Sequence, residues 1–161
     1  MKTFLFSTLA AVSVAYDHGF PDDSPFHAGC HLNTVLEAVT CADAQASSNQ
    51  LIVDNVDTDS QYKGKMSIYE EGDDWIYSKR LTYNGKYTDD QLFEYTQDGA
   101  NCSVASRSYS EAQSYIDNDV NFCNLWNVLS RTTGWSGTYQ VSMCSTDADG
   151  PADPVTTCAR Y

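Results

Sequence analysis

The three histidines of this chain lie close together near its N-terminus, where they could bind a metal ion. His27 and His31 have the spacing of two ligands one turn apart on a helix. Gly29 lies between them, however, and the predicted helix begins after His27. A copper site built on an N-terminal histidine needs histidine as the first mature residue, whereas the expected signal cleavage leaves His18 third. We therefore interpret all three as exposed side chains on an irregular arm and predict no metal site.

Two clusters of aspartates resemble calcium-binding loops but lack their spacing. An EF-hand loop needs glycine at its sixth position and glutamate at its twelfth. Counted from Asp57, these positions hold Tyr62 and Ile68. The second cluster, around Asp147 and Asp149, also fails on spacing. Both are interpreted as solvated turns, and no cofactor is predicted.

The acidic side chains are also the candidates for hydrolytic chemistry, because paired carboxylates are the catalytic groups of most glycosidases. The chain has 22 acidic residues, but no spacing marks a pair among the glutamates Glu37, Glu70, Glu71, Glu94 and Glu111. There is no G-x-S-x-G motif for a serine nucleophile. The sequence therefore favours a non-catalytic protein, and no catalytic residue is assigned.

Six cysteines are expected to form three disulfides: Cys30, Cys41, Cys102, Cys123, Cys144 and Cys158. A zinc site is the alternative, but the chain has no C-x-x-C pair. If Cys30 and Cys41 lie on one helix, they are roughly 16 Å apart along its axis. A disulfide tolerates a Cα separation of only about 7 Å. That pair is therefore excluded, and the other pairings stay open.

Two predicted strands each place aromatic side chains on one face. Trp75, Tyr77 and Tyr83 share a face of the first, and Trp135 and Tyr139 share a face of the second. If exposed, such rings offer a large contact area to sugars or a partner protein at low entropy cost. If buried, they form the core beneath a helix, which is the commoner outcome for any one strand. These five residues are the candidate ligand-binding residues.

Asn101-Cys102-Ser103 has the form of an N-glycosylation sequon, so Asn101 is a candidate glycosylation site. A disulfide at Cys102 would lower the use of this site.

The elements that must position these residues begin with an amphipathic helix. Leu32, Val35, Leu36 and Val39 stand at i, i+3, i+4 and i+7, which predicts a helix over residues 30–42. Asn84-Gly85 is a favoured two-residue hairpin turn. Helical spacing predicts a short second helix at residues 122–129. Strands are expected at residues 51–56, 62–69, 75–83, 92–97, 102–109 and 135–144.

The fold class is therefore α+β: an N-terminal amphipathic helix packed on an antiparallel sheet, with a short second helix and up to three disulfides. Residues 1–15 combine Lys2, an apolar stretch and small residues before the cleavage point, as in a secretory signal peptide. Residues 16–29 form an irregular arm, and residues 30–161 form a single domain. No later segment is long and apolar enough to span a membrane.

The net charge of −13 argues against nucleic acid and anionic membrane surfaces as partners, because their phosphates would be repelled. We expect a secreted, extracellular, acidic module that binds glycan or protein, or that self-associates into a surface layer. A secreted hydrolase using acidic residues is the first alternative. A small-ligand carrier is the second, and it would require an apolar cavity.

Overall fold

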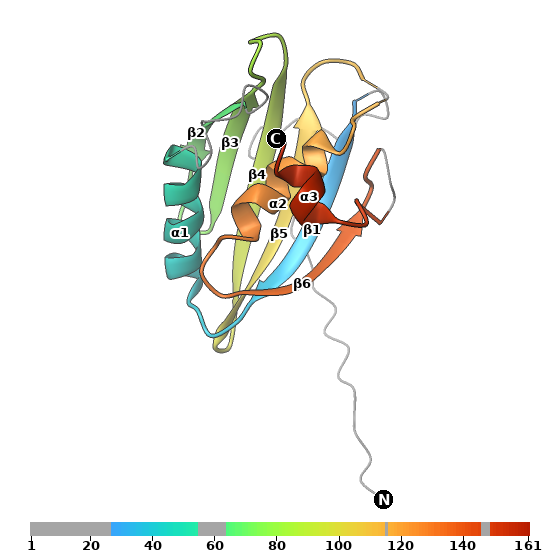
Figure 1. Ribbon diagram of the computed structural model, residues 1–161. Helices are drawn as coiled ribbons and strands as arrows, with labels where there is room; N and C mark the ends of the chain where they lie inside the picture. The colour runs from blue at the N-terminus through green and yellow to red at the C-terminus, as the bar shows by residue number, and fades with distance from the viewer. Residues whose placement is uncertain (1–26, 55–63, 115, 146–148) are drawn as a thin grey trace, which may run out of the picture.

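The computed structural model describes residues 27–54, 64–114, 116–145 and 149–161. Within them a six-stranded antiparallel sheet has the order β2-β3-β4-β5-β1-β6. Three helices lie on one side of this sheet (Figure 1), which confirms the α+β class. The elements are β1 (Gly29–Leu36), α1 (Cys41–Val53), β2 (Lys65–Glu71), β3 (Trp75–Leu81), β4 (Thr88–Asp98), β5 (Asn101–Ser110), α2 (Val120–Leu129), β6 (Trp135–Ser142) and α3 (Pro154–Cys158).

The helix predicted over residues 30–42 is wrong: its first part is strand β1, paired with β5 and β6. Leu32 and Leu36 are buried, and a separation of four residues suits one face of a helix or one face of a strand equally well. Val35 decides between them, because it is 42% exposed on the opposite face of the sheet. The apolar pattern was therefore read with the wrong period.

The first helix is α1, which begins where the predicted helix was expected to end. Thr40 is its N-cap, and the Thr40 side chain accepts a hydrogen bond from the Asp43 amide at 3.1 Å. Its buried residues are Ala44, Ser48 and Ile52, spaced four apart. Ala44 is small and Ser48 is polar, so the apolar periodicity of this segment is weak. The strand expected at residues 51–56 is also wrong, because residues 51–53 form the last turn of α1. Residues 55 and 56 lie outside the described residues.

Most of the other predicted elements are confirmed. Four predicted strands correspond to the β2–β5 meander, the last to β6, and the second helix to α2. Asn84-Gly85 lies in the β3–β4 turn and Gly85 has φ +66°, but the turn is longer than the two residues predicted. The Thr82 amide donates a hydrogen bond to the Tyr87 carbonyl oxygen at 2.9 Å, and the residues between them form the loop. The C-terminal segment, for which no helix or strand was predicted, contains the short helix α3.

The core lies between the sheet and helices α1 and α2. Its largest fully buried apolar side chains come from both layers: Leu32, Leu36, Ile76, Leu92, Phe93 and Val104 from strands, and Ile52, Phe122, Leu125 and Leu129 from helices. All but Leu92 belong to the helix-side cluster. None of the described helices is long and apolar enough to cross a membrane.

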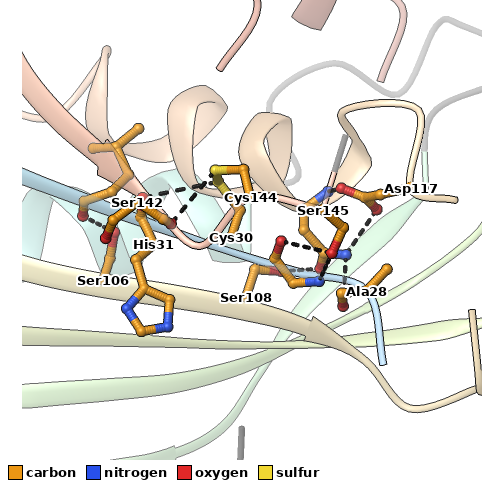
Figure 2. The surroundings of a disulfide bond; sticks show 12 residues. Ala28, Cys30, His31, Ser106, Ser108, Asp117, Ser142, Cys144 and Ser145 are labelled. Atoms are coloured by element: carbon orange, nitrogen blue, oxygen red, sulfur yellow. Dashed lines mark hydrogen bonds between the residues drawn. A yellow bond between two sulfur atoms is a disulfide. The ribbon is translucent and has the colours of Figure 1, made fainter. Parts of the chain in front are cut away.

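The six cysteines form three disulfides, as predicted. They join Cys30 to Cys144, Cys41 to Cys102 and Cys123 to Cys158. Cys30 and Cys41 are not paired, as expected, although they lie on a strand and a helix rather than on one helix. Figure 2 shows the Cys30–Cys144 sulfurs on the side of β1 that faces the helices and the His31 ring on the other side. Such cross-links are typical of proteins that fold in an oxidising, extracellular environment.

A buried carboxylate caps helix α2. Asp119, the N-cap residue, has φ +65° and makes no side-chain capping bond. Asp117 replaces it: its two oxygens accept hydrogen bonds from the Asn121 backbone amide at 3.0 Å and the Asn121 side chain at 2.7 Å. Burial raises the pKa of Asp117 to about 7, because desolvation of the charged form exceeds the benefit of these bonds. The β5–α2 connection is thereby anchored at its helical end.

A buried ion pair between β3 and β4 is also hydrogen-bonded to α2. Arg80 and Asp89, both almost fully buried, form an ion pair at 3.5 Å. Asp89 also accepts hydrogen bonds from Asn124 at 3.1 Å and from Ser110 at 2.8 Å. These two extra donors help to offset the free-energy cost of burying the Asp89 charge. Removal of either Arg80 or Asp89 would leave the other charge buried without its counter-ion, which would destabilise the fold.

The Cys123–Cys158 disulfide should hold α3 on α2. We expect the variant with Cys123→Ser and Cys158→Ser to lose about 2–4 kcal/mol of unfolding free energy in urea, since the bond restricts the unfolded chain. Amide hydrogen exchange should accelerate in Pro154–Cys158 and stay slow in β4 and β5. Unchanged protection of α3 would show that packing alone holds this helix.

Asp117 should make stability depend on pH. Its folded-state pKa of about 7 lies above the ordinary value of 3.8, so the folded state binds more protons between these values. Its contribution to the unfolding free energy therefore falls as pH rises from about 4 to 7. In Asp117→Asn this decline should be absent, whatever constant offset the altered cap adds. Melting temperatures measured from pH 4 to 8 test this, and parallel profiles for the two proteins would contradict it.

Candidate functional site

The face of the sheet opposite the helices carries aromatic and charged side chains side by side. Strand alternation sends Ile76, Ser78 and Arg80 toward the helices, so Trp75, Tyr77 and Lys79 point to the other face. There Tyr77, Leu92 and Tyr109 form a second apolar cluster, with Trp75 packed against it. The helix-free face of the sheet therefore has a small apolar cluster of its own beside its charged side chains.

A group of five residues, here called the Lys79 cluster, lies on this face: Tyr69, Tyr77, Lys79, Asp90 and Glu111. The Lys79 ammonium lies 3.1 Å from an Asp90 oxygen and 2.7 Å from a Glu111 oxygen. The same Asp90 oxygen accepts a hydrogen bond from the Tyr77 hydroxyl at 2.8 Å. The ammonium also lies over the Tyr69 ring, 4.9 Å from its centre, and 5.7 Å from the centre of the Tyr77 ring.

The cluster depends on the register between β3 and β4. Lys79 pairs across the strands with Asp90, and the next residues, Arg80 and Asp89, pair on the other face. Two consecutive cross-strand pairs are thus both ion pairs, one beneath the helices and one in the Lys79 cluster. A slip of one residue would break both, so the two pairs together define the register.

The surroundings shift the ionisation of all three central groups. Burial raises the pKa of Asp90, although hydrogen bonds from Tyr77 and Lys79 oppose the shift. Burial, followed by the hydrogen bond to Asp90, raises the pKa of the Tyr77 phenol. Burial lowers the pKa of Lys79, but the bonds to Glu111 and Asp90 outweigh it, and the net shift is upward. At neutral pH Tyr77 is therefore a neutral donor and Lys79 a cation.

Part of the cluster is accessible from outside. Tyr69 is 63% exposed, and the Glu111 side chain is 43% exposed. The Lys79 side chain is 29% exposed, whereas Asp90 beneath it is buried. An aromatic ring, a cation and a carboxylate can therefore meet a ligand together, supported by a buried second carboxylate.

Two glycines fix the aromatic rings around this cluster. A Cβ atom on Gly72 would lie 2.2 Å from Nε1 of Trp75, and one on Gly29 would lie 2.4 Å from the Tyr109 ring. Both rings thus lie directly on backbone, which no larger residue would permit. His31 hydrogen-bonds to the Tyr109 hydroxyl, and the two rings meet edge to face.

The five predicted ligand-binding aromatics do not form one site. Trp75 and Tyr77 are brought together on the helix-free face. Tyr83 lies beyond β3 in the turn to β4 and is 59% exposed. Trp135 and Tyr139 are on the helix side of β6, where they stack on each other with ring centres 6.0 Å apart.

Of the five cluster residues, only Tyr77 and Glu111 were candidates from the sequence; the exposed Tyr69 was not among the predicted ligand-binding aromatics. Glu111 was one unpaired candidate among several glutamates, and neither Lys79 nor Asp90 was singled out. The alternation along β3 already placed Lys79 beside Tyr77, which was a usable signal. Asp90 and Glu111 come from a neighbouring strand and from the start of the β5–α2 connection, so their approach depends on strand register and on the path of that connection.

The other predicted sites have clear positions. Asn101 begins β5, and its side-chain oxygen accepts a hydrogen bond from the Ala38 amide at 3.0 Å. The prediction that the histidines are exposed on an irregular arm is wrong for two of them: His31 lies in strand β1, and the partly buried His27 donates a hydrogen bond to the Ser110 carbonyl oxygen at 2.7 Å. His18 lies outside the described residues. The aspartate cluster at Asp57 lies outside them too. In the described part of the chain, no three metal-ligating side chains gather into a site.

Comparison with known proteins gives no match: no protein family, no curated protein and no solved structure is detectably similar to this chain. The geometry of the Lys79 cluster is therefore the basis on which a function is assigned.

Proposed function

We propose that this protein is a secreted, non-catalytic module that binds glycans at the Lys79 cluster. The observation that carries the proposal is an exposed Tyr69 ring held beside an ammonium that two carboxylates orient. Sugars present an apolar ring face and a rim of hydroxyl groups. An aromatic ring suits the first, and charged hydrogen-bonding groups suit the second.

The cluster is organised before any ligand arrives. Asp90 and Glu111 orient the Lys79 ammonium, whose N–H groups are the donors that this cluster can offer to a ligand hydroxyl. The second carboxylate oxygen of Glu111 can accept a hydrogen bond from a ligand hydroxyl. Because these side chains already have fixed partners, little conformational entropy remains to be lost on binding. A rigid antiparallel sheet supports the arrangement from below.

A pair of tyrosine variants tests this proposal. Tyr69→Ala should weaken binding to a neutral oligosaccharide about ten-fold, because it removes the stacking surface. Tyr87→Ala is the matched control: Tyr87 is 54% exposed but lies in the β3–β4 turn, outside the cluster. A glycan array followed by calorimetry on the best oligosaccharide would measure both. Equal losses in the two variants, or no binding to any glycan by the wild type, would contradict the proposal.

A secreted hydrolase is the second candidate, because two carboxylates contact the same ammonium. One Asp90 oxygen and one Glu111 oxygen contact the same Lys79 ammonium, at 3.1 and 2.7 Å, so the two carboxyl groups lie close together. Retaining glycosidases place their carboxyl groups about 5–5.5 Å apart. Asp90, whose pKa is raised by burial, would be the proton donor, and exposed Glu111 the nucleophile. The cation between them neutralises charge that a nucleophile needs, so binding is the better-supported function.

The Glu111→Gln variant separates the two candidates. A hydrolase would release shortened products from an oligosaccharide and lose that activity in Glu111→Gln. A binding module would leave the oligosaccharide intact in wild type and variant alike, with only a change in affinity. Mass spectrometry of the sugar after prolonged incubation measures the outcome, and product release by the wild type alone would replace our proposal with the hydrolase.

A further inference from the structure

The Asn101-Cys102-Ser103 sequon lies at an open place in the structure, beside the tip of the β4–β5 hairpin (Figure 1). It is the only Asn-x-Ser/Thr triplet of the chain. The two tip residues, Gly99 and Ala100, are exposed, and nothing lies within 4 Å of a Cβ atom built on Gly99. This end of the hairpin therefore has room for an attached oligosaccharide.

The Asn101 side-chain amide has a defined orientation. The Ala38 backbone amide donates a hydrogen bond to Oδ1 of Asn101 at 3.0 Å. A backbone N–H can only donate, so the side-chain atom that faces it must be the oxygen and not the nitrogen. N-linked sugars are attached to the nitrogen, Nδ2, and no group among the described residues accepts a hydrogen bond from it. The oxygen thus anchors the side chain while the acceptor nitrogen stays available.

Strand alternation separates the reactive groups of the sequon from its disulfide. Ser103 pairs directly with Val35, which is 42% exposed on the helix-free face, so Asn101 and Ser103 belong to that face. Cys102 is fully buried on the helix side, where it is bonded to Cys41. The disulfide and a glycan on Asn101 would lie on opposite sides of β5 and can therefore coexist in the folded protein.

We infer that Asn101 carries an N-linked oligosaccharide in the secreted protein. In the transfer reaction, Nδ2 attacks the anomeric carbon of a lipid-pyrophosphate-linked oligosaccharide. The new C–N bond forms as the bond from that carbon to the pyrophosphate oxygen breaks, and Nδ2 gives up one proton. The transfer precedes folding, because in the folded chain Cys102 and Ser103 are paired with strands on both sides.

The glycan leaves the Lys79 cluster accessible. Asn101 pairs with Asp98, and Asp90 of the cluster lies earlier on the same strand, near its other end. At about 3.3 Å per residue, Asp90 and Asp98 are roughly 26 Å apart along β4. The inference is therefore independent of the proposed function, and either can hold without the other.

Intact-mass spectrometry of the full chain secreted by eukaryotic host cells tests the inference. We expect a mass above that of the mature chain by whole hexose and N-acetylhexosamine units, which a peptide-N-glycosidase removes. Ser103→Ala should abolish this added mass, because it removes the hydroxyl group of the sequon while Asn101 keeps its bond to Ala38. Ser67→Ala is the matched control: it removes an exposed strand hydroxyl outside the sequon and should keep the glycan.

Three results would contradict the inference. The first is a wild-type protein at the mass of the mature chain alone. The second is added mass that persists in Ser103→Ala, or that peptide mapping assigns to a peptide without Asn101. The third is loss of the added mass in Ser67→Ala as well as in Ser103→Ala. Because the transfer precedes folding, these masses decide the question even for a variant of lower stability.

Discussion

Strand β1 is the constraint on which the rest of the structure depends. It lies between β5 and β6, although it comes first in the domain and they come late. The sheet can be completed only when the chain has travelled out through α1 to the far edge and returned through the β2–β5 meander. Leu32 and Leu36 on one face enter the core, and Cys30 is bonded to Cys144 just beyond β6. The disulfide thus fastens a contact that is costly to form because it joins distant parts of the chain.

Each face of the sheet has a cross-strand ion pair between β3 and β4, and the two pairs have different roles. Arg80 and Asp89 are buried beneath α2, where additional hydrogen bonds to Asp89 help to offset the cost of their desolvation. Their chain neighbours Lys79 and Asp90 face the other way, where Lys79 is partly exposed and Glu111 adds a second carboxylate. One ion pair therefore specifies packing, and the adjacent one organises a surface. The alternation of strand side chains alone separates these roles.

Local signals predicted the regions of the structure that fold locally. The alternation along Trp75–Leu81 and the helical spacing around Leu125 correspond to observed elements, and Asn84-Gly85 marks the position of the β3–β4 turn although not its length. The failure at β1 has a physical cause: Leu32 and Leu36 suit either period, and the pairing with β5 and β6 that makes this segment a strand is remote in sequence. Helix α1 was not predicted because two of its buried residues, Ala44 and Ser48, are small. They pack the helix closely on the sheet but give little apolar periodicity in the sequence.

The sequence by itself determined the number of disulfides, the α+β class, the acidic surface and which β3 residues share a face, because these follow from composition and from local periodicity. Only the tertiary structure decided the partners of each cysteine, the central place of β1 and the meeting of Lys79 with Asp90 and Glu111. It also decided that Trp135 and Tyr139 pack beneath α2 while Tyr69 remains exposed. These outcomes depend on strand order and register, which are set by the summed burial of both faces and by no short segment of the chain.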